Sequence, residues 1–208
     1  MYIIYTIMIS YLWKQDMVFY IITAFVILFC LKIYSESEVF NLKCIISDVD
    51  GNTYCVRNRL KLQESANLLA NVNKQAIEFV KKLGKDFPEN EAVQRLVKGF
   101  DPKKVSETLP NEKLTSYSEN KGEKLAFCLS KTKHSEKLID ENTLKFVYLH
   151  ELAHIMSKSI GHKKEFWDNF KFLIGEAKKL GFYNPIDYKK NNQTYCGMTI
   201  TDNPYYDL

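Results

Sequence analysis

The stretch FVYLHELAHIMSKSIGH, residues 146–162, places a cluster of polar side chains in an apolar setting. It holds three of the four histidines found in 208 residues, together with one glutamate. On a helix, His150 and His154 lie one turn apart and project from the same face. Two interpretations compete: a polar patch on an ordinary helix, and a site where imidazoles share one metal ion.

Several features of this stretch favour the metal site. Glu151 follows the first histidine, so its carboxylate is offset from the ligand positions and suits a general base. Gly161 can adopt the backbone angles that turn the chain back after a helix, and His162 directly after it supplies a third ligand. We therefore predict that His150, His154 and His162 bind Zn²⁺ and that Glu151 is the catalytic base.

Other side chains compete for roles at this site. Glu165 and Glu176 follow in the next expected helix, and either carboxylate can replace His162 as the third ligand. Cys196 can approach the metal as an inhibitory thiolate, although a buried free cysteine is the more ordinary state. A tyrosine hydroxyl can stabilise a transition state, and the candidates for that role are Tyr183, Tyr188 and Tyr195.

The N-terminal part of the chain differs from the rest in composition. The 18 residues Met17–Tyr34 contain one charge, Lys32. A helix of that length is about 27 Å long, enough to cross a bilayer core. A cleaved signal peptide is disfavoured because no basic segment precedes the apolar run and no small-x-small cleavage site follows it. A buried core helix is disfavoured because the segment is apolar on every side.

We therefore expect two parts: residues 1–35, with a transmembrane anchor at 17–34, and a folded domain at 36–208. Only Lys14 precedes the span, whereas four basic residues follow it within the first 59 residues: Lys32, Lys43, Arg57 and Arg59. The positive-inside rule then places the domain on the cytosolic side. About nine residues, 35–43, link the anchor to the first expected strand, so the domain should work close to the membrane.

The cysteines agree with a reducing compartment. The five cysteines include no C-x-x-C pair, and their odd number argues against a complete disulfide framework. One observation points the other way. The motif Asn192-Gln193-Thr194 is a glycosylation sequon, which matters only in a luminal or exported domain.

Local patterns predict a mixed α+β domain. Asp50-Gly51 indicates a hairpin, and Asp101-Pro102 is typical of a helix start. The expected elements are a hairpin of residues 43–49 with 53–57, helices at 63–83 and 91–99, a hairpin turning at 120–122, helices at 143–159 and 164–180, and an irregular tail beyond 184. We expect the apolar strand 125–129 to form a sheet edge above the metal, where an extended peptide substrate can pair with it.

Composition limits the partners. The net charge of +4 is mild and the basic residues are scattered, whereas attraction to nucleic acid needs a concentrated basic face. A nucleic acid partner is therefore not expected. The expected partners are a protein or peptide substrate and, through the N-terminal helix, a membrane.

The motifs HELAH and GHKKEFW resemble those of the WLM/SprT-like zincins, in which a histidine in a G-H-x-x-x-F context follows the HExxH helix. The chain is most similar to short WLM-like proteins of large DNA viruses. The shared features there are a hydrophobic N-terminus, the DG-x-x-Y-x-VRN hairpin at 50–58, the TSY…KG…FCL strands at 115–129, the NTL-x-FV-x-LHELAH helix at 142–154, and YCG at 195–197.

The resemblance implies a zincin-like α+β fold, with a small sheet over an active-site helix, and peptide hydrolysis. The expected function is a membrane-anchored zinc metallopeptidase. The alternative is a membrane-anchored interaction protein with a structural or relic zinc site. Glu151 separates the two, because a structural site has no use for a base beside an open metal position and usually takes four protein ligands.

Overall fold

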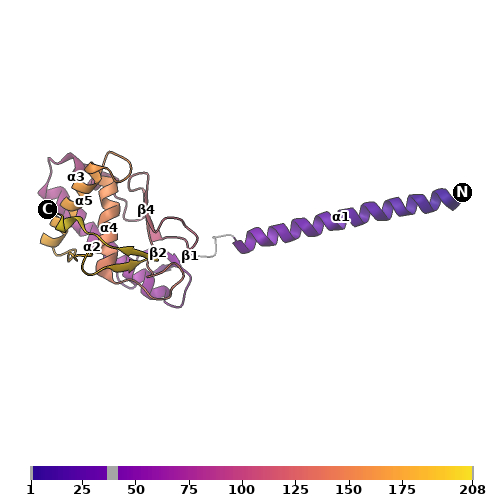
Figure 1. The fold of residues 1–208 in the computed structure, drawn as a ribbon, viewed down its shortest axis with the longest axis horizontal. Helices are drawn as coiled ribbons and strands as arrows, with labels where there is room; N and C mark the ends of the chain where they lie inside the picture. The colour runs from indigo at the N-terminus through magenta and orange to yellow at the C-terminus, as the bar shows by residue number, and fades with distance from the viewer. Residues whose placement is uncertain (1, 37–41, 208) are drawn as a thin grey trace. The chain divides into compact units, whose positions relative to one another are not determined.

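The structure is a computed structural model that describes residues 2–36 and 42–207. The chain divides into two compact units, Met1–Phe40 and Asn41–Leu208. The first unit contains one helix, α1 (Tyr2–Glu36), drawn in indigo in Figure 1. The linker expected between anchor and domain falls partly on residues 37–41, which lie outside the described residues.

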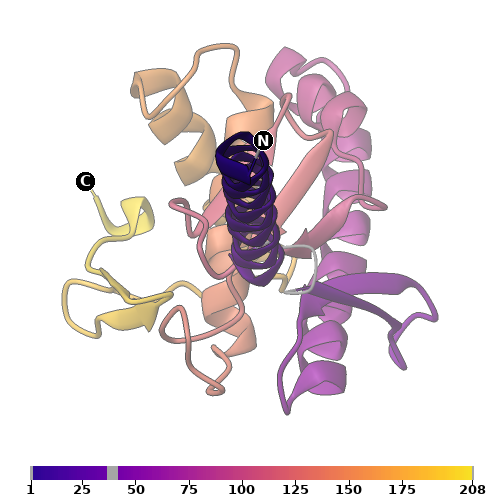
Figure 2. The same ribbon diagram turned by 90° about the vertical axis from the view of Figure 1, so that its right-hand side faces the viewer.

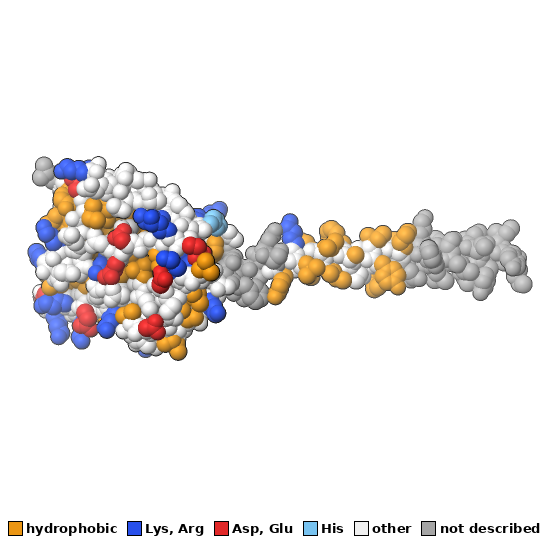
Figure 3. Space-filling model, turned by 90° about the horizontal axis from the view of Figure 1, so that it is seen from below, with side chains coloured by type: hydrophobic (Ala, Val, Ile, Leu, Met, Phe, Trp, Pro, Cys, Tyr) orange, Lys and Arg blue, Asp and Glu red, His pale blue; other side chains and the backbone are white. Residues whose placement is uncertain are grey.

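The described side chains of α1 are apolar except for Thr23 and Lys32, and they are exposed around the whole helix. Figure 3 shows them in orange along the shaft, and every residue of Met17–Tyr34 is exposed. An exposed apolar helix of 18 residues is long enough to cross a membrane, although a signal sequence near an N-terminus has the same properties.

The second unit is built on a five-stranded mixed sheet in the order β1-β2-β3-β5-β4. Its strands are β1 (Leu42–Ile46), β2 (Thr53–Arg57), β3 (Val105–Glu107), β4 (Ser116–Glu119) and β5 (Lys124–Phe127). The pairs β1–β2 and β4–β5 are antiparallel, whereas β2–β3 and β3–β5 are parallel. The sheet edges are therefore β1 and β4.

This order corrects one expectation. The prediction that strand 125–129 forms the sheet edge was wrong, because β5 pairs with β3 on one side and β4 on the other. The second partner, β3, is only three residues long and was not predicted. A hairpin sequence does not show which of its two strands gains another neighbour.

Four helices of the second unit follow the predicted periodicity. They are α2 (Leu62–Asp86), α3 (Glu91–Gly99), α4 (Glu141–Met156) and α5 (Lys164–Lys179). Helix α4 begins where the Asp140 carboxylate accepts hydrogen bonds from the Thr143 backbone and hydroxyl. It ends earlier than expected, at Met156, because Ser157 is extended and bonds back to Ala153. The helix start predicted at Asp101-Pro102 was wrong: Asp101 caps a turn that leads into β3.

The tail beyond residue 184 is more regular than predicted. It contains a two-stranded hairpin, β6 (Gln193–Tyr195) with β7 (Met198–Ile200), and a short 3₁₀ helix, η2 (Pro204–Tyr206). In Figure 2 this yellow segment lies at the opposite side of the domain from the purple β1–β2 hairpin.

Helix α4 lies at the centre of this unit. It contacts α2, α3, α5, β4 and β5, and 11 of its residues are buried. Its Tyr148 is fully buried, where the ring stacks on Phe127 of β5 and the hydroxyl donates to Asn73 of α2 at 2.7 Å. The Asn73 amide in turn donates to the Tyr54 hydroxyl of β2 at 3.0 Å. These contacts fix the rotation of α4 relative to the sheet.

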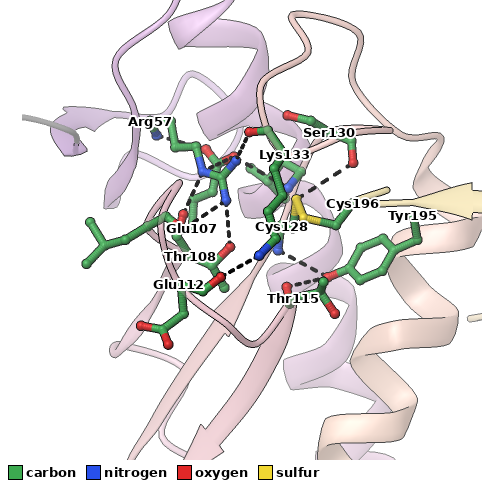
Figure 4. The surroundings of a disulfide bond; sticks show 12 residues. Arg57, Glu107, Thr108, Glu112, Thr115, Cys128, Ser130, Lys133, Tyr195 and Cys196 are labelled. Atoms are coloured by element: carbon green, nitrogen blue, oxygen red, sulfur yellow. Dashed lines mark hydrogen bonds and ion pairs between the residues drawn. A yellow bond between two sulfur atoms is a disulfide. The ribbon is translucent and has the colours of Figure 1, made fainter. Parts of the chain in front are cut away.

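A buried charge cluster joins the strands to the loops beyond them (Figure 4). The Glu107 carboxylate at the end of β3 is 1% exposed and pairs with Arg57 and Arg59. The Arg57 guanidinium also donates to the backbone oxygens of Thr108 and Lys133, each at 2.6 Å. Loss of one partner from such a buried pair costs about 3–5 kcal/mol, because the other charge stays buried.

Four of the five cysteines are paired, which corrects the expectation of unpaired thiols. Cys44 and Cys55 face each other in register across β1 and β2 and form one disulfide. Cys128, just after β5, bonds Cys196 in the turn between β6 and β7 (Figure 4). A cysteine count does not show which residues the fold brings together, and the fifth cysteine, Cys30 in α1, is a free thiol.

Candidate metal centre

The three histidines predicted as ligands converge on one point. One ring nitrogen from each of His150, His154 and His162 lies within 4.8 Å of the others. The Nε2 atoms of His150 and His162 are 3.1 Å apart. His150 and His154 come from adjacent turns of α4, whereas His162 comes from the loop that connects α4 to α5. The interpretation as a surface patch on one helix does not explain this third imidazole.

An aromatic pair in α5 supports all three imidazoles. The buried Phe166 ring lies 4.8, 4.4 and 4.6 Å from the rings of His150, His154 and His162. The indole nitrogen of Trp167 donates to the His162 backbone oxygen at 3.1 Å. The spacing of His162, Phe166 and Trp167 therefore lets the first turn of α5 pack against the imidazoles and hold the loop that carries His162.

The loop from Ser157 to Lys163 is held by two charged side chains that sequence reasoning did not assign to it. The Glu165 carboxylate accepts hydrogen bonds from the backbone amides of Lys158 and Ser159, at 2.7 and 2.9 Å. These bonds hold the pKa of Glu165 down, to about 2. The Lys121 ammonium donates to the backbone oxygens of His154, Ser157 and Ser159 at the C-terminus of α4, where a cation is favourable.

Lys121 reaches this position because the turn after β4 lies close to the helices. Asn120, Lys121 and Gly122 all have positive φ. A Cβ on Gly122 would meet the Gly99 backbone oxygen at 2.4 Å and the Ile155 side chain at 2.8 Å. Only glycine fits there, so the turn rests against α3 and α4. The sequence signals the turn but not its contact with the histidine-bearing helix.

Glu151 is almost fully buried beside the imidazoles, with 3% of the residue exposed. Burial raises the pKa of its carboxyl to about 7, against a smaller opposite effect from the Ser116 hydroxyl of β4. A carboxyl with a pKa near neutrality can both take up and release a proton at physiological pH. Its role as the catalytic base stays a prediction.

The donor set suits zinc. It consists of three imidazoles and no carboxylate, and imidazole nitrogen is a preferred zinc ligand. Burial, together with the neighbouring imidazoles, lowers the pKa of His150 to about 3. Burial and the charges nearby lower that of His154 to about 4. Neutral imidazoles with free electron pairs are the form that binds a metal ion. Three protein ligands leave a position for water or substrate, as in catalytic zinc sites.

The structure places the competing residues elsewhere. Glu176 pairs with Lys179 at 2.6 Å, and Glu165 holds the loop backbone, so neither belongs to the group of possible ligands. The expectation of a free Cys196 was wrong, because a disulfide sulfur is not a thiolate.

The three tyrosine candidates differ in position. Tyr195 lines the cleft beside Glu151, but its hydroxyl accepts from the Cys128 amide and donates to the Thr115 oxygen (Figure 4). Tyr183 and Tyr188 bond to each other at 3.3 Å and are not among the residues that line this cleft. The role of transition-state donor stays a prediction for these residues.

A cleft runs over the cluster. Its lining comes from β4 with the loop before it, from α4 with the loop after it, and from the tail hairpin. Apolar side chains dominate its walls: Leu114, Phe146, Val147, Ile160, Met198 and Ile200. Polar groups that line it include the three imidazoles, Glu151, Ser116 and Ser118. A cleft of this kind, apolar with a few polar groups, is typical of a binding site for an organic ligand.

The chain is similar to a known protein family and to proteins of large DNA viruses. The sequence profile of the WLM domain matches residues 59–205. The chain is similar to the uncharacterized protein R325 of Acanthamoeba polyphaga mimivirus, with 29% identity over 85% of this chain and 89% of that protein. It also resembles the uncharacterized protein 042R of Invertebrate iridescent virus 3, with 36% identity over 40% of this chain and half of that protein. No solved structure matches the chain.

Replacement of Glu165 tests how the loop positions His162. In Glu165→Ala the backbone amides of Lys158 and Ser159 lose their acceptor, so we expect zinc affinity to fall about tenfold, as for other residues that orient a ligand. Zinc affinity is measured by competition with a chelator. Glu176→Ala, in the same helix, is the matched control and should leave the affinity unchanged. Equal affinities in both variants would contradict a positioning role for Glu165, and a loss in Glu176→Ala would restore Glu176 as a ligand.

Proposed function

The chain belongs to the WLM family, and we propose on that basis that it is a membrane-anchored, zinc-dependent metallopeptidase. The WLM domain is associated with metallopeptidase-like activity and, in general, with zinc. The observation that carries the proposal is the convergence of three imidazole nitrogens within 4.8 Å beside a buried Glu151. In the proposed zincin-like fold, α4 and the loop after it carry this cluster beside a mixed sheet with an open edge strand.

Each residue of the cluster has a defined task in this proposal. His150, His154 and His162 hold the metal. Zinc, when bound, supplies a Lewis acid that polarises the peptide carbonyl and favours deprotonation of water at neutral pH. The Glu151 carboxylate takes a proton from the attacking water and then transfers it to the leaving amine nitrogen. Its raised pKa suits both transfers, since the group must gain and lose a proton in each cycle.

The edge strand β4 provides a place for the substrate backbone. The Cys128 amide donates to the oxygen of Thr115, the residue opposite it, so Thr115 and Tyr117 direct their polar backbone groups toward β5. The backbone groups of Ser116 and Ser118 then point outward from the edge. Both serines line the cleft with the histidines. An extended peptide can add there as another strand, with apolar side chains against the apolar walls.

The first test separates metal binding from chemistry. We expect Glu151→Gln to retain stoichiometric zinc and to lose peptidase activity about 10²–10⁴-fold, the usual contribution of a general base. His154→Ala should lose both zinc and activity. Metal content is measured by mass spectrometry and activity by digestion of a peptide library. Full activity in Glu151→Gln would refute the mechanism. Zinc without cleavage by the native protein would favour an interaction protein with a structural or relic site.

The second test concerns the edge strand. Ser118→Pro removes one outward amide but none of the hydrogen bonds between β4 and β5, so the sheet should persist. We expect kcat/KM for peptides to fall about fivefold, as for loss of one hydrogen bond of about 1 kcal/mol. The control Ser118→Ala keeps the amide and should keep the activity. Equal activity in the proline and alanine variants would exclude β4 as the substrate platform.

The third test addresses the anchor. If Met17–Tyr34 crosses a bilayer, the full-length chain should resist extraction by alkaline carbonate and migrate at its uncleaved mass. Extraction is followed by immunoblotting of membrane and soluble fractions, with a chain that lacks residues 1–35 as the soluble control. Release by carbonate, or a mature N-terminus near Ser35, would identify the segment as a signal sequence.

A further inference from the structure

The disulfides indicate the chemical environment of the domain. Cys128 and Cys196 are 0% and 3% exposed and join segments 68 residues apart, while Cys44 and Cys55 join the two strands of the first hairpin. Each bond requires that two thiols lose two electrons and two protons to an oxidant. Thiol–disulfide oxidants act in the secretory pathway and outside the cell, whereas cytosolic thiols are kept reduced. Paired cysteines on both halves of the sheet therefore indicate a domain outside the cytosol.

Two of the four basic residues that predicted a cytosolic domain, Arg57 and Arg59, are not evidence for the orientation of the span. Arg57 and Arg59 are largely buried and pair with Glu107, so they belong to the folded unit. The chain segments that form a domain are translocated largely regardless of their charge, and only basic residues within about 15–20 residues of the span set its orientation. The basic residues near the span are then Lys14 before it, Lys32 at its C-terminal end and Lys43 after it. The number of basic residues therefore differs little between the two sides of the span, and the two disulfides are the stronger evidence for the location of the domain.

The glycosylation sequon lies where a transferase can reach it. Asn192 directly precedes β6, and both Asn192 and Thr194 are exposed. The hairpin that carries them is fixed to the domain by the Cys128–Cys196 bond and by the amides of Cys196 and Gly197, which donate to Ser130 and Lys131. The sequence contains a single N-x-S/T motif with a residue other than proline in the middle.

From the disulfides and the exposed sequon together, we propose that the domain folds on the oxidising, luminal side of the secretory membrane and carries an N-linked glycan on Asn192. The donor is a lipid pyrophosphate-linked oligosaccharide. A bond forms between the Asn192 amide nitrogen and the anomeric carbon of the first sugar, and the bond from that carbon to the pyrophosphate oxygen breaks. The amide proton leaves with the lipid pyrophosphate, and no atom is oxidised or reduced. An anchor and a cleaved signal sequence both deliver the domain to this side.

The test expresses the full chain, with its N-terminal helix, in eukaryotic cells and compares its gel mobility before and after treatment with a glycan-removing amidase. We expect one shift of the size of a single glycan. Asn192→Gln and Thr194→Ala should abolish the shift. Thr194→Ser, which keeps the hydroxyl of the sequon, should retain it. Asn191→Gln is the matched control, since it changes the neighbouring exposed asparagine without altering the sequon.

A second measurement reports the compartment independently of the glycan. Cells are treated with a membrane-permeant alkylating reagent before lysis, and modified cysteines are identified by mass spectrometry. We expect the four cysteines of the domain, Cys44, Cys55, Cys128 and Cys196, to react only after reduction. Alkylation of these four cysteines without reduction would place the domain in a reducing compartment and overturn the proposal. A chain whose mobility the amidase does not change would also overturn it, whatever the state of its cysteines. Neither result bears on the peptidase activity.

Discussion

The structure depends on the burial of helix α4 on almost all of its surface. Its sequence is apolar around the helix, so the sheet and three other helices must enclose it. Three of its polar side chains, those of His150, Glu151 and His154, line a cleft together with β4 and the tail hairpin. A helix held by Tyr148, Phe127 and Asn73 cannot rotate, and its two histidines therefore project at a fixed angle.

Most of the groups that make the cleft are held by residues outside it. Phe166 supports the imidazoles, Glu165 and Lys121 hold the loop that bears His162, and the Cys128–Cys196 bond fixes the far wall. These supports come from four different segments. These supporting residues are needed because His162 lies in a loop, where no helix fixes the direction of its side chain.

The Cys128–Cys196 disulfide, which holds the tail hairpin beside the cleft, is also evidence for the cellular compartment of the domain. Tyr195 and Cys196 are adjacent: Cys196 is bonded to Cys128 at the end of β5, and the Tyr195 hydroxyl bonds to the backbone of Cys128 and of Thr115, just before β4. The tail hairpin therefore keeps its position best under oxidising conditions. The proposed glycan at Asn192 lies on this hairpin, next to Gln193, whose partner across the strands, Ile200, lines the cleft.

The sequence by itself determined the helices, two of the hairpins and the identity of the clustered histidines. Helical periodicity and the four-residue spacing of His150 and His154 are short-range properties, so they survive in any fold that keeps the helix. Only the tertiary structure decided which cysteines pair, that β4 and not β5 is the edge, and that Glu165 and Lys121 hold the loop. Each of those contacts joins residues from different secondary-structure elements, most of them far apart in the sequence. Such contacts form only when the whole chain packs.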